Sequence, residues 1–388
     1  MEFRFTEEQN MIRDTASEFL ADVSTSEAVR KAMTTEAGFD ANLWHRICNE
    51  LCFQSITIPE EFGGMGLGFV ELAAVLEPMG RVLLCSPFFS TVCLGVNALL
   101  VAGTQAQKET WLPKIAAGET TATLAYTGNN GGWDAQAVQA IYTKTNSGYQ
   151  LNGSLCYVPD GHTSDLLLIA ARAENSRGTE DGISLFVVPA NTTGITRTYL
   201  PTMDQTRKQA QIELKNVDVA SDALMNTEGK AWPALEKILQ LACVAVAAEQ
   251  MGGAQQILDM TVAYTKERVQ FGRVIASYQA IKHKAADMML KTEVARSAVY
   301  YAACVAQEAL FDGDKTIAAQ LLEASSMAKA YCSDAYFFNA GNAIQLFGGV
   351  GFTWEYDVHL YFKRAKSTET FLGNAAYHRE KIAVALLD

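Results

Sequence analysis

The chain has 388 residues, of which 49% are hydrophobic and 19% are charged, and its formal net charge is −12. This composition is typical of a globular protein with material for two or three domains and a large core. The chain is negatively charged and has no run rich in lysine or arginine. We therefore do not expect nucleic acid or an anionic membrane as a partner. No apolar stretch approaches the roughly 20 residues that a membrane-spanning helix requires, so we expect no membrane span.

Cysteine and histidine usage predicts a cytoplasmic protein without a metal. The eight cysteines are scattered without C-x-x-C spacing, and the five histidines show no metal-ligand spacing either. Cysteines of this kind are typically buried as small apolar side chains in a reducing compartment. We therefore expect free thiols rather than a disulfide framework or a metal site.

The N-terminal third of the chain has helical patterns. Thr6 and Gln9 have the spacing of a capping box, and apolar residues then recur at helical spacing from Ile12 to Val23. Similar patterns follow to about residue 118, interrupted by a glycine-rich stretch at 58–66. Clustered glycines permit backbone angles that other residues avoid, so we predict a loop there.

From about residue 121 the pattern changes to short β-rich runs, such as 165–171 and 182–189, and residues 211–215 alternate with period two. Helical periodicity returns near residue 231 and continues to the end, and in the long segment 281–310 one stripe of residues runs from Ile281 to Ala302. We predict an α+β multidomain fold: an N-terminal α-helical domain (1–120), a middle β-sandwich or barrel-like domain (121–228) and a C-terminal antiparallel four-helix bundle (229–388).

Three short motifs contain groups suited to a ligand. In the segment 267–273, Arg268 and Arg273 are able to bind phosphate in a two-pronged geometry, although a solvated helix end explains the same composition. The segment 345–352 places three glycines after a helical run, where bare N–H groups can hold phosphate; the alternative is an ordinary helix break. In the segment 124–134 a predicted strand is followed by a polar, glycine-rich loop, whose hydroxyl and N–H groups can bond a heteroaromatic ligand. The alternative is a simple surface loop.

Taken together, these segments resemble the acyl-CoA dehydrogenase family along nearly the whole chain. The matching stretches are IPEEFGGMGLGF at 58–69, MDQTR at 203–207, ERVQFGRVI at 267–275, YQAIKHKAADM at 278–288, QLFGGVGFTWEYDVHLYFKRA at 345–365 and AKSTE at 365–369. The resemblance implies non-covalently bound FAD, an acyl-CoA substrate that lies across the flavin, and α,β-dehydrogenation of the thioester. It also implies an electron-transfer flavoprotein or a similar acceptor, and a homo- or hetero-tetramer in which FAD crosses a subunit interface.

The resemblance assigns cofactor contacts residue by residue. The residue types suit these contacts, because a pyrophosphate attracts arginine and bare backbone while a flavin favours an aromatic face. The positions that contact the FAD of a neighbouring subunit are matched by Arg268, Phe271, Gln345, Gly348 and Gly349. Positions beside the flavin ring are matched by Tyr126, Thr127 and Tyr157, and positions beside the catalytic carboxylate and the FAD ribitol and diphosphate by Gly373 and Asn374.

The catalytic base of the family is missing from both of its usual positions. In most members a glutamate precedes the glycine of a late T-E-x-x-E-G pattern, and Leu372 stands there in this chain. The alternative position, ten residues before Gly252, is Ala242. Glu369 and Glu249 are weak replacements: Glu369 matches a glutamate that the family keeps beside its base, and Glu249 lies roughly 10 Å along a helix from Ala242, whereas a base must come within hydrogen-bond reach. The backbone N–H of Leu372 can still polarise a thioester carbonyl.

The flavin-ring side departs from the family as well. Trp133 replaces a serine that contacts FAD and CoA, and Pro159 replaces a threonine that bonds the flavin. Since the residues offered to a neighbour's FAD are intact, the chain resembles the base-lacking subunit of heteromeric bacterial acyl-CoA dehydrogenases, which act on steroid side chains and on dicarboxylic or cyclic acids. A base-bearing paralogue would then be its partner. Two alternatives stay open: a homomeric enzyme with a relocated base or non-oxidative thioester chemistry, and a silent structural or binding homologue.

Overall fold

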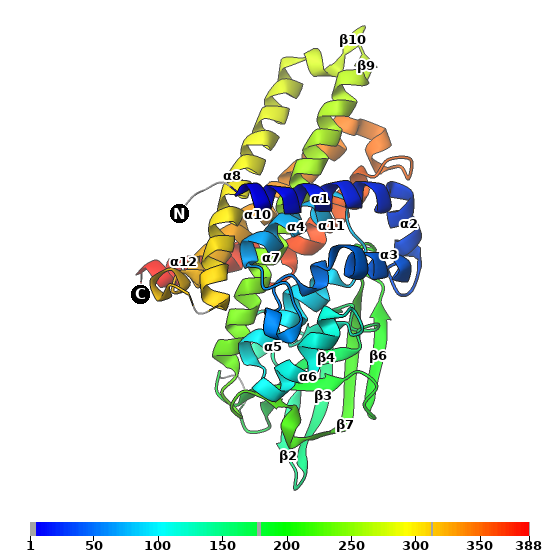
Figure 1. Cartoon of the computed structure of the whole chain (residues 1–388). Helices are drawn as coiled ribbons and strands as arrows, with labels where there is room; N and C mark the ends of the chain where they lie inside the picture. The colour runs from blue at the N-terminus through cyan, green and yellow to red at the C-terminus, as the bar shows by residue number, and fades with distance from the viewer. Residues whose placement is uncertain (1–4, 177–179, 312, 388) are drawn as a thin grey trace. The chain divides into compact units, whose positions relative to one another are not determined.

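The computed structural model describes residues 5–176, 180–311 and 313–387. The chain forms two compact units, each assembled from segments that are far apart in the sequence: residues 1–31, 69–84 and 243–388 in one, and residues 32–68 and 85–242 in the other. Two helices, α2 (Ser26–Thr34) and α7 (Trp232–Glu267), continue from one unit into the next. Figure 1 labels the elements along the chain.

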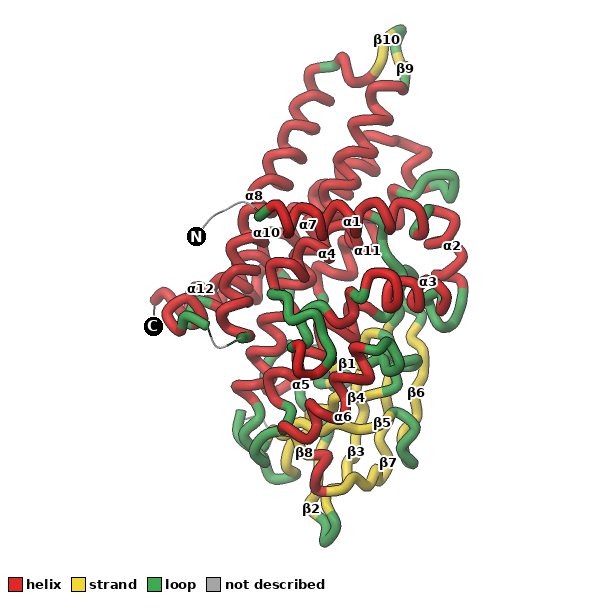
Figure 2. Tube along the Cα trace, viewed as in Figure 1, coloured by secondary structure: helices red, strands yellow, loops and turns green. Residues whose placement is uncertain are grey.

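The unit of residues 32–68 and 85–242 contains the β-sheet. Among the described residues its strands form one eight-stranded sheet in the order β6-β7-β3-β2-β4-β5-β8, with β1 paired to β4 (Figure 2). The strands are β1 (Ala122–Ala125), β2 (Ile141–Lys144), β3 (Gly148–Pro159), β4 (Leu166–Ala173), β5 (Ile183–Pro189), β6 (Ile195–Leu200), β7 (Gln209–Ala220) and β8 (Leu224–Met225). The helices of this unit are α3 (Ala41–Arg46), α5 (Asn97–Ala102) and α6 (Gln105–Ala116).

Burial in the sheet follows the sequence pattern of each strand. Strand β4 is buried along nearly its whole length, as expected for an apolar strand in the interior of a sheet that has parallel and antiparallel neighbours. Strand β7 alternates between buried and half-buried positions from Gln209 to Leu214, so one of its faces joins the core. The predicted period-two alternation is therefore confirmed.

The unit of residues 1–31, 69–84 and 243–388 is helical. Besides the C-terminal part of α7 its helices are α1 (Glu7–Val23), α4 (Phe69–Arg81), α8 (Gln279–Leu310), α9 (Lys315–Ala318), α10 (Leu321–Phe347), α11 (Val358–Thr370) and α12 (Ala375–Leu387). Helix α8 buries the predicted stripe from Met288 to Ala302. Helices α4 and α7 touch through their backbones, because a β-carbon on Gly252 would lie 2.0 Å from the carbonyl oxygen of Glu77.

The predicted order of helical, β and helical regions is confirmed. The capping box of Thr6 and Gln9 begins α1. In the loop at 58–66, Gly63 and Gly66 have positive φ, and a β-carbon on Gly64 would lie 1.9 Å from a backbone oxygen, which explains the glycines.

The described residues also bear on the cysteines and on membrane insertion. All eight cysteines are free thiols, and seven of them are partly or fully buried. The described residues contain no group of three or more His, Cys, Asp or Glu side chains that could hold a metal ion. Within the same part, no helix combines the length and the apolar character needed to cross a membrane.

Candidate functional site

The end of the α7–α8 pair carries an exposed β-hairpin (Figure 1). Strand β9 (Val269–Gln270) pairs with β10 (Arg273–Val274) across a two-residue turn. Both turn residues, Phe271 and Gly272, have positive φ, 53° and 79°, which suits a hairpin turn but is unusual for a bulky residue. Phe271 is 91% exposed. The sequence allowed a phosphate-binding motif or a solvated helix end for this segment. The structure has a hairpin instead, and the hairpin exposes an aromatic ring.

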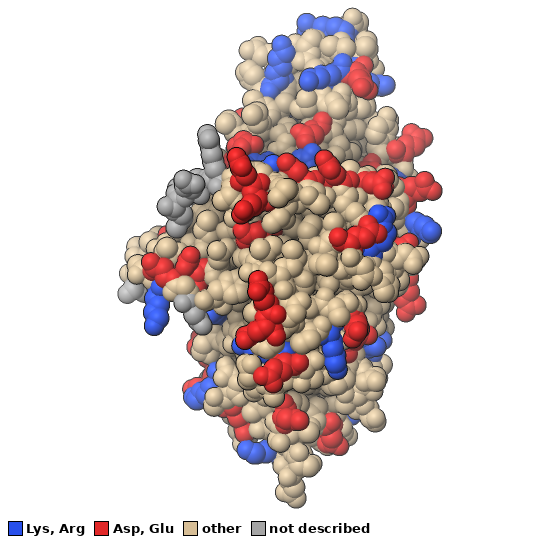
Figure 3. Space-filling model, in the orientation of Figure 1, with Lys and Arg blue, Asp and Glu red and all other residues tan. Residues whose placement is uncertain are grey.

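Basic side chains gather at this hairpin end (Figure 3). Arg268 is exposed, and its guanidinium makes no hydrogen bond or ion pair with the residues that the structure describes. Arg273, in contrast, lies over the ring of Tyr278 at 3.9 Å from its centroid. A free guanidinium among other cations suits a phosphate or pyrophosphate. The exposed cations of this end are Lys266, Arg268, Arg273, Lys282 and Lys284.

The glycine motif after α10 lies against the base of the hairpin. Tyr264, near the end of α7, stacks on Phe347 with ring centroids 4.1 Å apart, and its hydroxyl donates to the Phe347 carbonyl oxygen at 3.4 Å. Gly348 has a φ of 66°, and a β-carbon on Gly348 or Gly349 would meet no atom within 4 Å. The backbone here is therefore open to a ligand. All five residues assigned to a neighbour's cofactor are exposed: Arg268, Phe271, Gln345, Gly348 and Gly349.

The predicted flavin-ring residues belong to the unit that contains the sheet. Thr127 follows β1 and is buried, and its hydroxyl donates to the Gly132 carbonyl oxygen at 3.1 Å. Tyr157 on β3 has a φ of 60° and is 46% exposed, and a β-carbon on Gly131 would lie 3.1 Å from its ring. Tyr126 is buried beside Thr127. The structure thus brings the loop at 128–132 and Tyr157 together.

Polar groups of this loop are bonded within the loop and its strands. The side-chain oxygen of Asn129 accepts from the Ser154 hydroxyl at 3.2 Å and from the Cys156 thiol at 2.8 Å. The Thr127 carbonyl accepts from the Cys156 N–H. Together with the Thr127 hydroxyl bond, these contacts leave fewer donors for a flavin than the sequence motif alone suggests.

Helix α11 ends in a turn with two left-handed residues. Leu372 has a φ of 60° and Gly373 a φ of 108°, and the Leu372 side chain is buried. This backbone region costs a leucine roughly 1–2 kcal/mol, so the surroundings must hold it. The N–H of Leu372 forms no hydrogen bond with any described residue. An amide N–H without a protein partner can donate a hydrogen bond to a ligand, which makes this amide a candidate donor.

The carbonyl of Leu372, unlike its N–H, is fully engaged. It accepts from His378 Nε2 at 3.0 Å and from the Cys243 thiol at 3.7 Å, and the Ser326 hydroxyl lies 3.3 Å from His378 Nδ1. Burial, together with Lys329 nearby, lowers the pKa of His378 to about 3. Burial raises the pKa of the Cys243 thiol to about 11. Both groups are therefore neutral hydrogen-bond donors at pH 7 rather than proton acceptors.

Neither weak replacement for the base is a free carboxylate aimed at this turn. Glu369, in the last turn of α11, forms an ion pair with Lys366 at 2.7 Å, and its backbone carbonyl oxygen accepts from Lys329 at 3.2 Å. Glu249 is buried on α7, two helical turns from Ala242. Asn374, the other predicted cofactor residue of this segment, accepts from the Tyr377 N–H at 2.9 Å and so caps α12.

Sequence reasoning missed the buried polar groups around the turn, namely Cys243, Lys329 and His378. They lie on α7, α10 and α12, so only the tertiary fold brings them together. One signal was visible in the sequence: Lys329 stands between alanines in a helix of small residues, where a fully buried lysine is rare.

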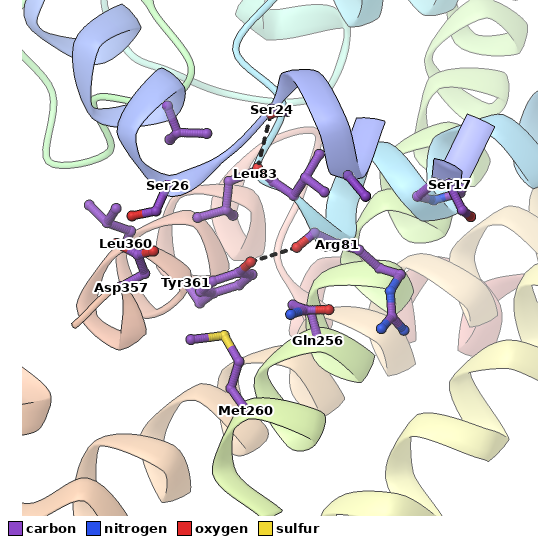
Figure 4. Close-up of a pocket in the computed structure, with 14 residues that line it drawn as sticks. Ser17, Ser24, Ser26, Arg81, Leu83, Gln256, Met260, Asp357, Leu360 and Tyr361 are labelled. Carbon is purple, nitrogen blue, oxygen red and sulfur yellow. Dashed lines mark hydrogen bonds between the residues drawn. The ribbon is translucent and has the colours of Figure 1, made fainter. Parts of the chain in front are cut away.

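A pocket of about 550 Å³ lies in the helical unit among α1, α2, α4, α7 and α11 (Figure 4). Its charged groups are compensated by the protein: Arg81 forms an ion pair with Asp259 at 2.8 Å, and Asp357 forms one with Arg30 at 2.6 Å. The hydroxyl of Tyr361 donates to the Arg81 carbonyl oxygen. None of the site residues predicted from the sequence lines this pocket.

Three family models match most of the chain. They are the acyl-CoA dehydrogenase N-terminal domain at residues 6–119, the middle domain at 123–217 and the C-terminal domain at 229–387. The chain therefore belongs to the acyl-CoA dehydrogenase family.

Individual relatives agree with this assignment. The acyl-CoA dehydrogenase IpdE2 of Mycolicibacterium smegmatis is 31% identical over 95% of this chain and 95% of that protein. The structure of butyryl-CoA dehydrogenase from Megasphaera elsdenii matches with a TM-score of 0.89 and 27% identity, covering 100% of both chains. A chain of the ChsE4-ChsE5 complex from Mycobacterium tuberculosis matches with a TM-score of 0.88 and 26% identity, over 100% of this chain and 99% of that one.

The family defines the chemistry: the chain is an FAD-dependent oxidoreductase of the CH–CH class. An acyl-CoA substrate and an electron-transferring flavoprotein as acceptor are typical of the family, and FAD supplies the hydride acceptor when it is bound. The residues present fit FAD at its pyrophosphate half, where the Arg268 guanidinium has no partner among the described residues and the backbone at Gly348 and Gly349 is open. At the ring half, the Thr127 hydroxyl is already bonded to its own loop.

Proposed function

We propose that this chain is the subunit of a heteromeric acyl-CoA dehydrogenase that lacks the catalytic glutamate and completes the FAD site of a base-bearing paralogue. The observation that carries the proposal is the buried Leu372 side chain at the base position. Removal of an α-proton requires an acceptor within hydrogen-bond reach of that proton. A leucine side chain has no such group, and the donors around its carbonyl are an imidazole and a thiol that are both protonated at the contacting atom.

The hairpin end and the loop at 128–132 differ in how many of their polar groups remain available, and this difference supports the same proposal. The residues assigned to a neighbour's FAD are exposed and, at Arg268, unpaired among the described residues. On the flavin-ring side, the Thr127 hydroxyl and the Asn129 side chain form hydrogen bonds with other groups of this chain. A subunit that serves mainly the cofactor of its partner needs the first region and can do without the second.

One of the similar structures is a chain of the ChsE4-ChsE5 complex from M. tuberculosis, which supports a second, different chain as the expected partner here. The partner would provide the glutamate and the flavin-ring contacts. Its substrate would be an acyl-CoA thioester, and the fatty-acid and steroid branches of the family are the candidates for the acyl group.

A second candidate function, a homomeric enzyme with a relocated base, is favoured by one observation: the carboxylate of Glu249 is buried on α7. Buried carboxylates often have functional roles. Against it stands the distance of about two helical turns from Ala242, the position that other members use.

Purification of the full chain, alone and with a base-bearing paralogue, separates these functions. The measurements are the ratio of flavin to chain and the reduction of an electron acceptor with octanoyl-CoA and with a CoA thioester of a steroid side chain. We expect the chain alone to be inactive and poor in flavin. Addition of the paralogue should restore both FAD and activity.

Two other outcomes would contradict the proposal. Yellow tetramers of the chain alone that reduce the acceptor would favour the relocated base, and Glu249→Gln would then abolish the activity. Absence of activity with every base-bearing paralogue, although complexes form, would instead favour a silent structural homologue.

A further inference from the structure

We infer that Lys329 is a positioning residue that clamps the turn 369–373, so that the Leu372 N–H is held ready to donate a hydrogen bond to the substrate thioester. The inference deepens the proposed function, because it takes this turn as part of an acyl-CoA site. It concerns how the chain binds and polarises a thioester, not which subunit removes the proton.

The first observation is the hydrogen bonding of the Lys329 ammonium. Lys329 lies on α10 and is fully buried. Its Nζ donates to the Gly373 carbonyl oxygen at 2.7 Å, to the Ser333 hydroxyl at 3.0 Å and to the Glu369 carbonyl oxygen at 3.2 Å. A buried ammonium is costly unless its hydrogen bonds are complete, and here three N–H donors meet three oxygens.

The second observation is where two of those oxygens lie. The Glu369 carbonyl belongs to the last turn of α11, whereas the Gly373 carbonyl follows Leu372, so the lysine bonds the chain on both sides of the leucine. The positive charge also lies at the C-terminal end of α11, where the helix dipole favours a cation. The lysine thereby fixes the entry and the exit of the turn.

The third observation is the division between donors and acceptors within the turn. The carbonyl groups of residues 369, 372 and 373 all bond to buried side chains, the middle one to His378. The N–H of Leu372 is the group left without a partner among the described residues. Fixing the carbonyls of residues 369, 372 and 373 restricts the amide between them, because only φ and ψ can rotate between planar peptide units.

A purely structural role of Lys329 does not explain the backbone conformation of Leu372, which lies between the two carbonyl groups that the lysine binds. Leu372 adopts a left-handed φ of 60°, which a leucine disfavours, and its side chain brings no catalytic group. The surroundings nevertheless enforce this conformation. A held amide that donates to a developing oxyanion is a known use of such enforced backbone geometry.

The test measures the polarisation of a bound thioester by infrared difference spectroscopy. The full chain is loaded with octanoyl-CoA that carries a ¹³C label at the thioester carbonyl. A hydrogen bond to that carbonyl lowers its stretching frequency, so the wild-type chain should show a downshift relative to free octanoyl-CoA. In Lys329→Met at least half of this downshift should be lost, and the affinity for octanoyl-CoA should weaken by about tenfold, the loss of one well-aligned hydrogen bond.

The matched control is Asn339→Ala on the same helix. Asn339 is buried, and its amide donates to the Ala254 and Met288 carbonyls and to the Thr292 hydroxyl, away from the turn. We expect this variant to lower the unfolding midpoint but to keep the full downshift. A merely structural lysine would behave in the same way as Asn339.

A folded Lys329→Met chain with the wild-type downshift would overturn the inference. If that variant does not fold, Lys329→Gln, which keeps an N–H donor, takes its place: a partial downshift supports the clamp and a full one overturns it. If the wild-type chain binds octanoyl-CoA without any downshift, the inference fails while the proposed subunit role stands. If it binds no acyl-CoA even with the paralogue present, the proposed acyl-CoA site fails and the inference fails with it.

Discussion

The hairpin end and the loop at 128–132 are both assigned to FAD, yet they differ in how their polar groups are used. At the hairpin end, Arg268 and Phe271 are exposed, and the glycines beside them have open space where a side chain would stand. In the loop, the Thr127 hydroxyl and the Asn129 side chain are bonded to neighbouring groups of the same unit. The first region therefore has groups that a ligand can reach, whereas these polar side chains of the second region are bonded within the chain.

Membership of the family therefore does not by itself show that a chain can bind its own FAD and remove a proton from the substrate. A chain can keep the surface assigned to a neighbour's cofactor while a leucine stands at the position assigned to its own base. The C-terminal turn shares features of both regions. The Leu372 side chain is apolar and buried, but the Leu372 N–H has no hydrogen-bond partner among the described residues.

The largest effect is expected from Leu372→Glu. The substitution places a carboxylate where the family has its base, in a turn whose backbone is already held by Lys329 and His378. General-base catalysis typically contributes a factor of 10² to 10⁴, so acyl-CoA-dependent reduction of an acceptor should rise by at least about 100-fold over the wild-type chain. The measurement uses the purified chain with saturating FAD.

Leu372→Gln is the matched control for that gain. It has the shape of the glutamate without the ability to accept a proton, so it should remain at the wild-type level. Equal activities of the two variants, or no gain in a glutamate variant that binds both FAD and acyl-CoA, would show that more than the base is missing from this site.

Arg268→Ala tests the outward-facing region. Its free guanidinium is expected to bond the pyrophosphate of the partner's FAD, and charge-assisted hydrogen bonds contribute about 1.5–3 kcal/mol. Removal should therefore weaken FAD binding by the reconstituted complex by about 10- to 100-fold, as measured by flavin fluorescence during titration. Arg273→Ala is the control, because that guanidinium is engaged with Tyr278. A loss no larger than in this control would remove Arg268 from the site.

Gly349→Ala separates ligand contact from protein stability. A β-carbon at this position would meet no atom of the chain within 4 Å, so the unfolding midpoint should not fall. If FAD approaches the bare backbone there, the added methyl group should weaken FAD binding several-fold, by about 1 kcal/mol. Gly341, on α10, has similarly open space, and Gly341→Ala should leave FAD binding unchanged. Unaltered FAD affinity in Gly349→Ala would mean that no ligand uses that space.

The sequence predicted the elements of the fold better than the environment of the site. Period-two alternation in β7, the stripe of α8 and the capping box of α1 are local patterns, and all three are confirmed. The resemblance also assigns Leu372 to the base position, and this assignment stays a prediction. Local patterns determine such features because they depend on residues a few positions apart.

The hydrogen-bond partners of that turn could not be predicted in this way. Cys243, Lys329 and His378 come from three helices separated by tens of residues, and nothing in their spacing marks them as neighbours. The hairpin after α7 was missed for a related reason: Phe271 at positive φ contradicts its own preference, so composition favoured a helix end. Residues that break local rules for a tertiary or functional reason are the ones that sequence patterns miss.

A further effect, on stability rather than on ligand binding, concerns the protonation of His378. Burial and the nearby Lys329 lower its pKa to about 3 in the folded chain, whereas an unfolded chain has the ordinary value of 6.5. Between these two values the unfolded state binds more protons than the folded state, so the free energy of unfolding rises with pH and falls as the solution is acidified below pH 6.5. The contribution is at most about 1.4 kcal/mol per pH unit, or about 2 kcal/mol between pH 6.5 and 5. Denaturant titrations at several pH values measure it.

His378→Gln isolates this contribution from that of the carboxylates elsewhere in the chain. The glutamine amide can still donate to the Leu372 carbonyl oxygen, but it does not titrate. The variant should therefore lose less stability than the wild type on acidification, even if it is less stable at pH 7. Other charged or titratable groups that face the imidazole are Lys329, Lys381 and the Cys243 thiol. Burial lowers the pKa of Lys329 only to about 8 and raises the pKa of the Cys243 thiol to about 11, so neither of these two groups changes charge between pH 5 and 6.5. Parallel stability curves for the two proteins would show that His378 already accepts a proton in the folded chain, and that the donor assigned to its Nε2 belongs to a charged ring.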